Sequence, residues 1–164
     1  MLQQSAIVDI MEKLERPGDY PHFVTVETNG TQPLRSKFRD YLAQQFAEKG
    51  KEWFWSISPK LRISGEPWEA AIKPEIVASY AAASPHGQLK YVVDNDDRTW
   101  AEVDKATALY RRAGVDLPVY IMPVGGLVED QQETAGKIAD EAIARGYNLA
   151  ARLQCYLYGN VIGT

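Results

Sequence analysis

Apolar residues recur with two different periods at the start of the chain. Over residues 2–15 they are spaced three and four apart until a Pro-Gly pair ends the pattern, which predicts an amphipathic helix. Residues 22–28 (HFVTVET) are rich in β-branched and aromatic side chains and run into an Asn-Gly pair, which predicts a strand ending in a tight loop. The chain therefore opens with a helix followed by a strand.

The same alternation continues along the sequence. Further helices are expected over 38–49, 74–83, 99–113 and 129–145. Further strands are expected at 53–58, 88–94, 118–124 and 148–156. Thr99 and Glu102 have the spacing of a capping box, and the longest expected loops are 61–73 and 125–128. Strands that alternate with helices of this length imply right-handed crossovers, so the expected fold class is α/β with a mainly parallel sheet.

Composition limits the class of protein. The 164 residues, 45% hydrophobic and 24% charged, match a single domain spanning 1–164. A formal net charge of -4 argues against a nucleic-acid partner, because binding phosphates needs a basic face. The amino terminus lacks the pattern of a signal peptide, and no stretch has about 18 consecutive apolar residues. We therefore expect a cytoplasmic protein with no membrane partner.

The residues that follow each strand are the candidates for chemistry, because ligands bind at the carboxyl ends of the strands in a parallel α/β sheet. The first strand ends in Glu27, Thr28 and Asn29. Their carboxylate, hydroxyl and amide suit an amine, a ribose hydroxyl or a pterin edge. The alternative is a turn in which Thr28 and Asn29 bind backbone groups. The residues alone leave both interpretations open.

Two further strand ends carry distinctive residues. Ser58, Pro59 and Lys60 combine a fixed backbone with a lysine that can meet a carboxylate, although an ordinary exposed lysine is the alternative. The fourth strand runs into Pro123, Val124 and two glycines, which let the backbone approach a ligand closely or simply form a turn. This segment matches neither a phosphate-binding loop nor a dinucleotide fingerprint.

Metal ligands are scarce in the sequence. His22 and His86 have no acidic or thiol residue at ligand spacing, so we expect both to be structural or exposed. Cys155 is the only cysteine and lies in an apolar run expected to be a strand, where a buried and unreactive thiol is usual. One cysteine excludes an internal disulfide and any site built from several thiolates. Trp53 and Trp55 share one face of their strand and are assigned to the core.

Five motifs in one order resemble the 7-carboxy-7-deazaguanine synthase (QueE) family of radical S-adenosylmethionine enzymes. They are VETNGT (26–31), SPKL (58–61), QLKYVV (88–93), IMPVGG (121–126) and ARLQCYLYGNVIGT (151–164). The opening MLQQSAIVDIMEKL also resembles the segment that follows the GGEP motif of radical S-adenosylmethionine enzymes. The resemblance covers nearly the whole chain. It implies the carboxyl-terminal portion of an incomplete, TIM-like barrel.

The resemblance also implies a ligand site. The residues implied to contact S-adenosylmethionine are Ser58, Pro59, Lys60, Met122, Pro123, Val124 and Gly125. The residues implied to contact the substrate are Glu27, Thr28, Asn29 and, through the terminal carboxylate, Thr164. A lysine suits the methionyl carboxylate of S-adenosylmethionine, because the two form a charge-assisted hydrogen bond. No catalytic residue and no metal ligand is assigned within the chain.

In the family, a 4Fe-4S cluster bound by a cysteine motif near the amino terminus cleaves S-adenosylmethionine. The radical so formed starts a magnesium-assisted ring contraction of 6-carboxy-5,6,7,8-tetrahydropterin in queuosine biosynthesis. A chain with one cysteine cannot hold that cluster. We therefore expect lyase activity only with a complementary amino-terminal half that brings the cluster and Mg²⁺, and a second copy of the chain is the other expected partner. The alternatives are a noncatalytic S-adenosylmethionine- or pterin-binding or interaction module, or an inactive remnant.

Overall fold

The computed structural model describes residues 3–14 and 21–159 and contains one five-stranded sheet. The strands are β1 (Phe23–Thr28), β2 (Glu52–Ile57), β3 (Gly87–Val93), β4 (Val119–Pro123) and β5 (Asn148–Leu149). The helices are α1 (Gln4–Lys13), α2 (Ser36–Lys49), α3 (Trp68–Ala71), α4 (Pro74–Ala83), α5 (Asp97–Arg112), α6 (Val128–Ala144), α7 (Leu153–Tyr158) and the short 3₁₀ helix η1 (Arg62–Ser64). Strands and helices alternate along the chain, which confirms the α/β class.

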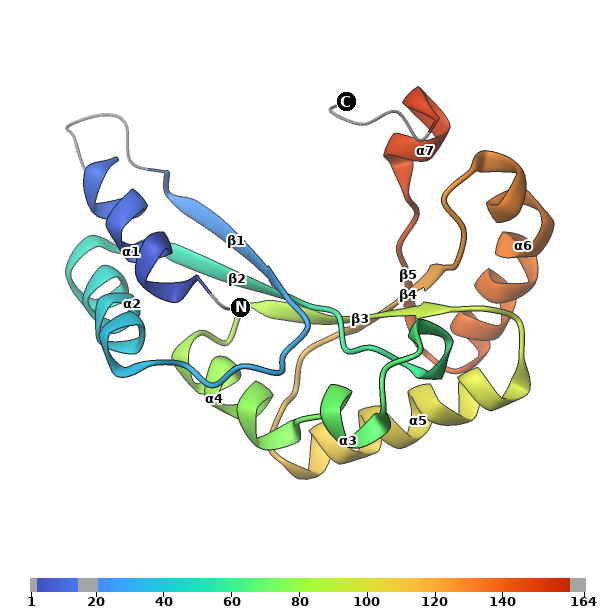
Figure 1. Ribbon diagram of the computed structural model, residues 1–164, viewed down its shortest axis with the longest axis horizontal. Helices are drawn as coiled ribbons and strands as arrows, with labels where there is room; N and C mark the ends of the chain where they lie inside the picture. Colours follow the sequence, from blue (N-terminus) through green and yellow to red (C-terminus); the bar gives the residue numbers. More distant parts are fainter. Residues whose placement is uncertain (1–2, 15–20, 160–164) are drawn as a thin grey trace.

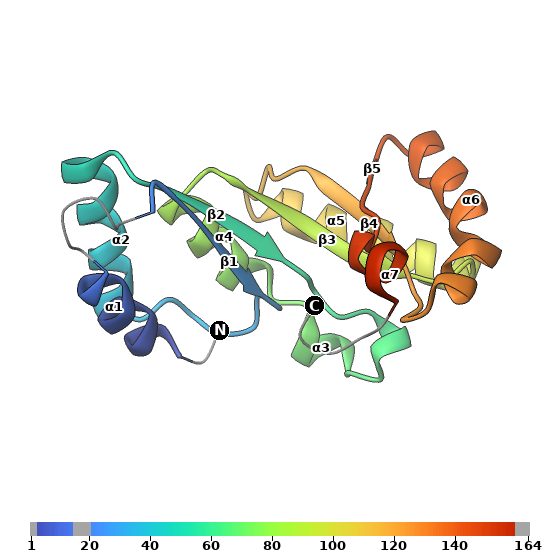
Figure 2. The ribbon, with the colours of Figure 1, turned by 90° about the horizontal axis from the view of Figure 1, so that it is seen from above.

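The sheet is parallel throughout, and the order of its strands is their order in the chain. Helices α2, α4 and α5 lie on one side of the sheet, whereas the opposite side of β1 to β3 is open (Figures 1 and 2). Consecutive parallel strands with helices on one side are arranged as in a section of an α/β barrel. Among the described residues β1 and β5 are the edges of the sheet. The assignment of this section to an incomplete, TIM-like barrel stays a prediction.

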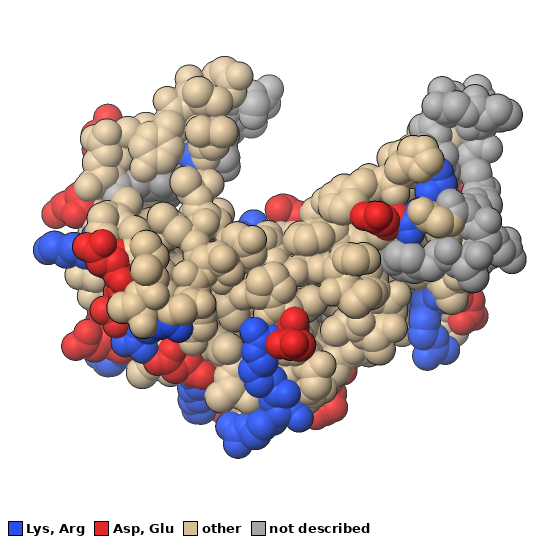
Figure 3. Space-filling view, turned by 180° about the vertical axis from the view of Figure 1, so that it is seen from behind, with Lys and Arg blue, Asp and Glu red and all other residues tan. Residues whose placement is uncertain are grey.

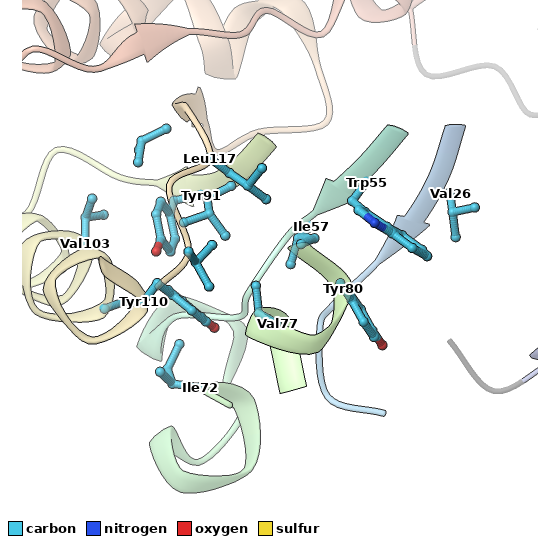
Figure 4. Packing of buried hydrophobic residues seen from close by; sticks show 14 of the residues in the cluster. Val26, Trp55, Ile57, Ile72, Val77, Tyr80, Tyr91, Val103, Tyr110 and Leu117 are labelled. Carbon is cyan, nitrogen blue, oxygen red and sulfur yellow. The ribbon is translucent and has the colours of Figure 1, made fainter. Parts of the chain in front are cut away.

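The core lies between the sheet and these helices, because alternate strand residues point to that side. Trp53 and Trp55 are fully buried on β2, as expected. Phe38 of α2 meets the two indoles edge-on, with ring centroids 5.9 and 6.4 Å away. Tyr80 of α4 stacks on Trp55 at 5.0 Å (Figure 4). These contacts fix two helices against β2, the strand that leads into the SPKL motif.

The other set of alternate residues faces the open side of the sheet and is rich in polar side chains. On this face Gln88 Nε2 donates to Ser56 Oγ at 3.1 Å, and Lys90 pairs with Glu27. Parallel sheets are normally covered on both faces and have near-continuous apolar strands. A polar, uncovered face is therefore the side on which this sheet can bind a ligand.

The fifth strand is much shorter than expected. β5 contains only Asn148 and Leu149, which pair with β4, so the expected strand 148–156 is wrong beyond Leu149. The chain then enters α7, where the Cys155 amide donates to the Arg152 carbonyl at 2.9 Å. Periodicity alone does not distinguish a short apolar strand from a buried helical segment. Cys155 is buried, as expected, but it lies in a helix.

The start of α5 also differs from its expected form. The helix is capped by Asp96, whose side chain accepts a hydrogen bond from the Arg98 amide. Thr99 and Glu102 therefore do not form a capping box, because both accept hydrogen bonds from Arg62 instead. Arg62 belongs to the segment expected to be a long loop, which contains η1 and α3.

Some expectations concern residues outside the described ranges, namely Thr164 and the Pro17-Gly18 helix stop. Within residues 3–14 and 21–159, His22 and His86 are both exposed. In the same ranges no three His, Cys, Asp or Glu side chains are grouped as metal ligands would be. None of the helices described there is long and apolar enough to span a bilayer.

Candidate functional site

A cavity of about 430 Å³ opens on the uncovered side of the sheet, at the carboxyl ends of the strands. In Figure 3 the molecule is hollowed beside the raised end that carries α6 and α7. Side chains at or near the ends of β1 to β4, together with the segment after β5, contribute to the cavity, as expected for a parallel α/β sheet. Its lining residues are Glu27, Thr28, Asn29, Ser56, Ser58, Lys60, Lys90, Val92, Met122 and Arg152.

The end of β1 combines a structural turn with an exposed carboxylate. Thr28 Oγ1 accepts a hydrogen bond from the Gly30 amide at 3.1 Å. Asn29 Oδ1 accepts from the amide and the hydroxyl of Thr31, at 3.3 and 2.9 Å. The turn-forming interpretation of Thr28 and Asn29 is therefore correct, although both also line the cavity. Glu27 is different, because 77% of its side chain is exposed and its carboxylate is available to a ligand.

Glu27 has a cationic partner that lies within a strand. Lys90 Nζ is 3.6 Å from Glu27 Oε1, and only 18% of the Lys90 side chain is exposed. This lysine belongs to the QLKYVV motif, but no role was predicted for it, because it lies within a strand and not at a strand end. The available signal was the alternation of Gln88 and Lys90 with apolar residues, since a lysine inside a parallel strand is rarely buried without a reason.

The SPKL motif continues the sheet and then reaches the cavity. The Ser58 amide donates to the Thr28 carbonyl at 2.7 Å, which holds the ends of β1 and β2 together. Lys60 is half-buried and lines both the larger cavity and a smaller one of about 190 Å³. Lys60 is therefore not fully exposed, and its contact with a ligand stays a prediction. Pro59 is buried and lines the smaller cavity.

The end of β4 contributes fewer side chains than the resemblance implied. Met122 lines the larger cavity and Val124 the smaller one. Pro123 is buried within β4, and among the described residues neither Pro123 nor Gly125 lines either of these two cavities. Their expected contacts with S-adenosylmethionine stay a prediction.

Arg152 reaches the site from the far edge of the sheet. It lines both cavities, and its Nε lies 3.3 Å from the sulfur of Met122. Arg152 was not predicted as a site residue, because residues 148–156 were expected to form a strand. The chain instead leaves the sheet after Leu149, which brings Arg152 over the end of β4.

No protein-family model and no solved structure matches the chain. The chain is 31% identical to the 7-carboxy-7-deazaguanine synthase of Pyrobaculum aerophilum over 111 residues, which cover 67% of this chain and 45% of that protein. It is 29% identical to the 7-carboxy-7-deazaguanine synthase of Rhodopirellula baltica over 171 aligned positions, which cover 96% of this chain and 58% of that protein. The chain is QueE-like. The resemblance drawn from the five motifs is thereby confirmed.

This QueE-like chain spans about half the length of the two synthases, 45% of one and 58% of the other. Among the described residues that line its cavity are three cations, Lys60, Lys90 and Arg152, and one carboxylate, that of Glu27. The excess of positive charge contrasts with the net charge of -4 of the whole chain. Because opposite charges attract more strongly in a partly enclosed site, the cavity is suited to an anionic ligand.

Arg62 fastens the segment after the SPKL motif of this QueE-like chain to the start of α5. Its amide donates to Glu102 Oε2 at 2.9 Å, and its guanidinium donates to Thr99 Oγ1 at 3.1 Å and lies 3.6 Å from Asp96 Oδ2. Hydrogen bonds from Arg98 hold the pKa of the Asp96 carboxyl below its ordinary value, so this partner of Arg62 stays ionised. These contacts hold one wall of the site in place.

Replacing Arg62 with alanine is expected to loosen this segment without unfolding the chain. The pair with Asp96 is partly exposed, at 42% and 32%, so its loss costs little stability. The amides of Ser64 and Gly65, which donate to carbonyls within this segment, should exchange hydrogen about two- to fivefold faster. Hydrogen-exchange mass spectrometry measures this rate. Arg98→Ala is the control, because it removes a contact of Asp96 without touching the segment, and equal effects of the two variants would contradict the assignment.

Proposed function

We propose that this chain provides the S-adenosylmethionine- and pterin-binding part of a 7-carboxy-7-deazaguanine synthase. The observation that supports the proposal most directly is the convergence of the VETNGT, SPKL, QLKYVV and IMPVGG motifs on one cavity. The proposed reaction is the ring contraction of 6-carboxy-5,6,7,8-tetrahydropterin in queuosine biosynthesis. The completed protein is therefore a lyase.

The proposed position of S-adenosylmethionine is where the two cavities meet. Lys60 lines both cavities and can pair with the methionyl carboxylate, while Ser58 can donate a hydrogen bond beside it. The smaller cavity also contains the apolar side chains of Leu61, Ile63 and Val124, which suit the face of a nucleobase. When bound, S-adenosylmethionine supplies the radical that starts the reaction.

The proposed position of the pterin is the larger cavity beside β1. The Glu27 carboxylate can accept hydrogen bonds from the amino edge of the ring. Thr28 and Asn29 stabilise the turn that follows Glu27, through the hydrogen bonds that they accept within it. The contact expected from the terminal carboxylate of Thr164 concerns a residue outside the described ranges and stays a prediction.

The residues of the chain do not fit a 4Fe-4S cluster. Such a cluster is bound by several thiolates, and the sequence contains one, Cys155, which is buried in α7. The proposal therefore requires a complementary segment that brings the cluster and Mg²⁺. The edge of β1, which has no partner strand among the described residues, offers backbone groups to such a segment or to a second copy of the chain. The proposed compartment is the cytoplasm, whose reducing conditions preserve thiolates.

The test is co-expression of the chain with the cysteine-bearing segment of a full-length synthase, followed by anaerobic cluster reconstitution and an assay for 7-carboxy-7-deazaguanine. We expect product. Lys60→Ala and Glu27→Ala should each reduce its rate of formation about tenfold to a hundredfold, because each removes a charged contact to a ligand. Lys137→Ala is the matched control, because Lys137 is exposed on α6.

A noncatalytic S-adenosylmethionine- or pterin-binding module is the second candidate, favoured by the single cysteine. It predicts a complex with an intact cluster that binds S-adenosylmethionine but forms no product. Aggregation of the chain and failure to associate with the cysteine-bearing segment would instead favour an inactive remnant. The three outcomes are distinguishable in one preparation.

A further inference from the structure

Lys90 is a largely buried cation with little to neutralise it. It projects from β3 onto the uncovered face of the sheet, and 18% of its side chain is exposed. Its ammonium group has three donors, and the acidic partner described for it is Glu27, 3.6 Å away. Because 77% of the Glu27 side chain is exposed, water competes strongly for that carboxylate. An anion brought by a ligand would satisfy Lys90 better than Glu27 does.

Arg152 is a second cation of the same cavity in a similar situation. Its guanidinium group has five donors. The side-chain acceptor that the described residues offer it is the thioether sulfur of Met122, at 3.3 Å from Nε. A thioether is a weak acceptor, and an arginine fork matches a carboxylate far better. Both cations therefore line the cavity with hydrogen-bond donors that a ligand can use.

We infer that Lys90 and Arg152 form an anion-binding subsite that recognises the carboxylate of the pterin ligand. The inference rests on the proposed function and deepens it, since it names the group of the substrate that determines specificity. Lys60 remains for the carboxylate of S-adenosylmethionine, so the three cations of the cavity serve the two carboxylates of the two ligands. Glu27 is the counter-ion that the substrate carboxylate displaces from Lys90.

The test compares two pterins that differ in one group. 6-Carboxypterin carries the carboxylate and pterin lacks it, and both are fluorescent, so their binding to the full chain can be titrated directly. The wild-type chain should bind 6-carboxypterin about tenfold to a hundredfold more tightly than pterin. Lys90→Met and Arg152→Met should each reduce this preference about tenfold, and the double variant should remove it. Binding of pterin itself should stay within about twofold in all three variants.

A substitution of Glu27 should strengthen the binding of 6-carboxypterin, which a purely structural role of Glu27 would not predict. Glu27→Gln removes the competitor for Lys90, so 6-carboxypterin should bind the variant severalfold more tightly relative to pterin. Lys137→Met on α6 is the matched lysine control and should leave the preference unchanged. Circular dichroism establishes that each variant is folded.

Two results would overturn the subsite. One is a preference for 6-carboxypterin that persists in the folded Lys90→Met, Arg152→Met double variant. The other is a wild-type chain that binds neither pterin and is not stabilised by oxalate, which serves as a probe with carboxylate groups and no ring. Thermal stabilisation by oxalate that the double variant loses would support the subsite and contradict the pterin function. No stabilisation by oxalate would reject the subsite as well.

Discussion

Replacing Trp55 with alanine is expected to lower the free energy of unfolding by about 3–5 kcal/mol. The indole is fully buried, stacks on Tyr80 of α4 and meets Phe38 of α2 edge-on. Its removal leaves a cavity that the rings of Tyr80 and Phe38 cannot fill by small movements, because each is held on a packed helix. The indole N–H has no hydrogen-bond partner among the described atoms, so the loss is one of packing. Urea unfolding followed by circular dichroism measures it.

Two variants separate packing at Trp55 from the general effect of losing a tryptophan. Trp55→Phe keeps a ring against Tyr80 and should lose only about 1–2 kcal/mol. Trp68→Ala truncates a half-buried indole that carries Lys105 on its face, 4.4 Å from the ring centre, and should lose about 1 kcal/mol. Equal losses in Trp55→Ala and Trp68→Ala would contradict the assignment of Trp55 to the centre of the core.

The core and the ligand site are connected through Tyr80. Its hydroxyl donates to the carbonyl of Gln32, in the loop that follows the VETNGT motif. Burial raises the pKa of Tyr80, so the hydroxyl keeps its proton and remains a donor. A core substitution that displaces Tyr80 therefore also disturbs the loop that follows β1, the strand that carries Glu27. Trp55→Ala should for this reason weaken ligand binding as well as stability.

Local patterns predicted most of the fold because they coincide here with burial. The helix expected over 74–83 has those bounds, since a proline at its first position and an apolar face favour the same conformation. The failure at 148–156 has a tertiary cause. The sheet accepts one more hydrogen bond after β5, from the Ala150 amide to the Ile121 carbonyl, and the chain then turns away. Apolar content alone does not predict where a strand loses its partner.

The site was predicted in part, for a reason that its geometry explains. Glu27, Ser58, Lys60 and Met122 reach the cavity because they follow or end parallel strands, and strand ends are visible in a sequence. Lys90 reaches it from within a strand, where only the polar alternation indicates which face it occupies. Ser56 and Val92 precede the last residues of β2 and β3, as Glu27 and Met122 do in β1 and β4, so the same local signal was available for them. Arg152 depends on where the chain leaves the sheet, and that information is not local.

Replacing Gly30 with alanine is expected to lower the free energy of unfolding by about 2–5 kcal/mol. Gly30 has a φ of +75°, in the left-handed region where a side chain costs about 1–2 kcal/mol. A Cβ atom there would lie 2.8 Å from Val77 Cγ2 and 3.0 Å from Ile57 Cγ2, closer than packed carbon atoms approach. Val77 and Ile57 are fully buried, so relieving this overlap costs about 1–3 kcal/mol more.

Gly50→Ala separates the two contributions, because Gly50 also has a positive φ, 58°, but open space where its Cβ would lie. It should lose only about 1–2 kcal/mol in the same urea titration. Val77→Ala removes the closer of the two contacts and leaves the one with Ile57, so the Gly30→Ala, Val77→Ala double variant should be more stable than the sum of the two single losses predicts. If Gly30→Ala and Gly50→Ala lose the same free energy of unfolding, and the losses in the double variant are additive, then the steric overlap does not contribute to the cost of Gly30→Ala. Because the Gly30 amide donates to Thr28 Oγ1, Gly30→Ala should also weaken binding of 6-carboxypterin, whereas Gly50→Ala should not.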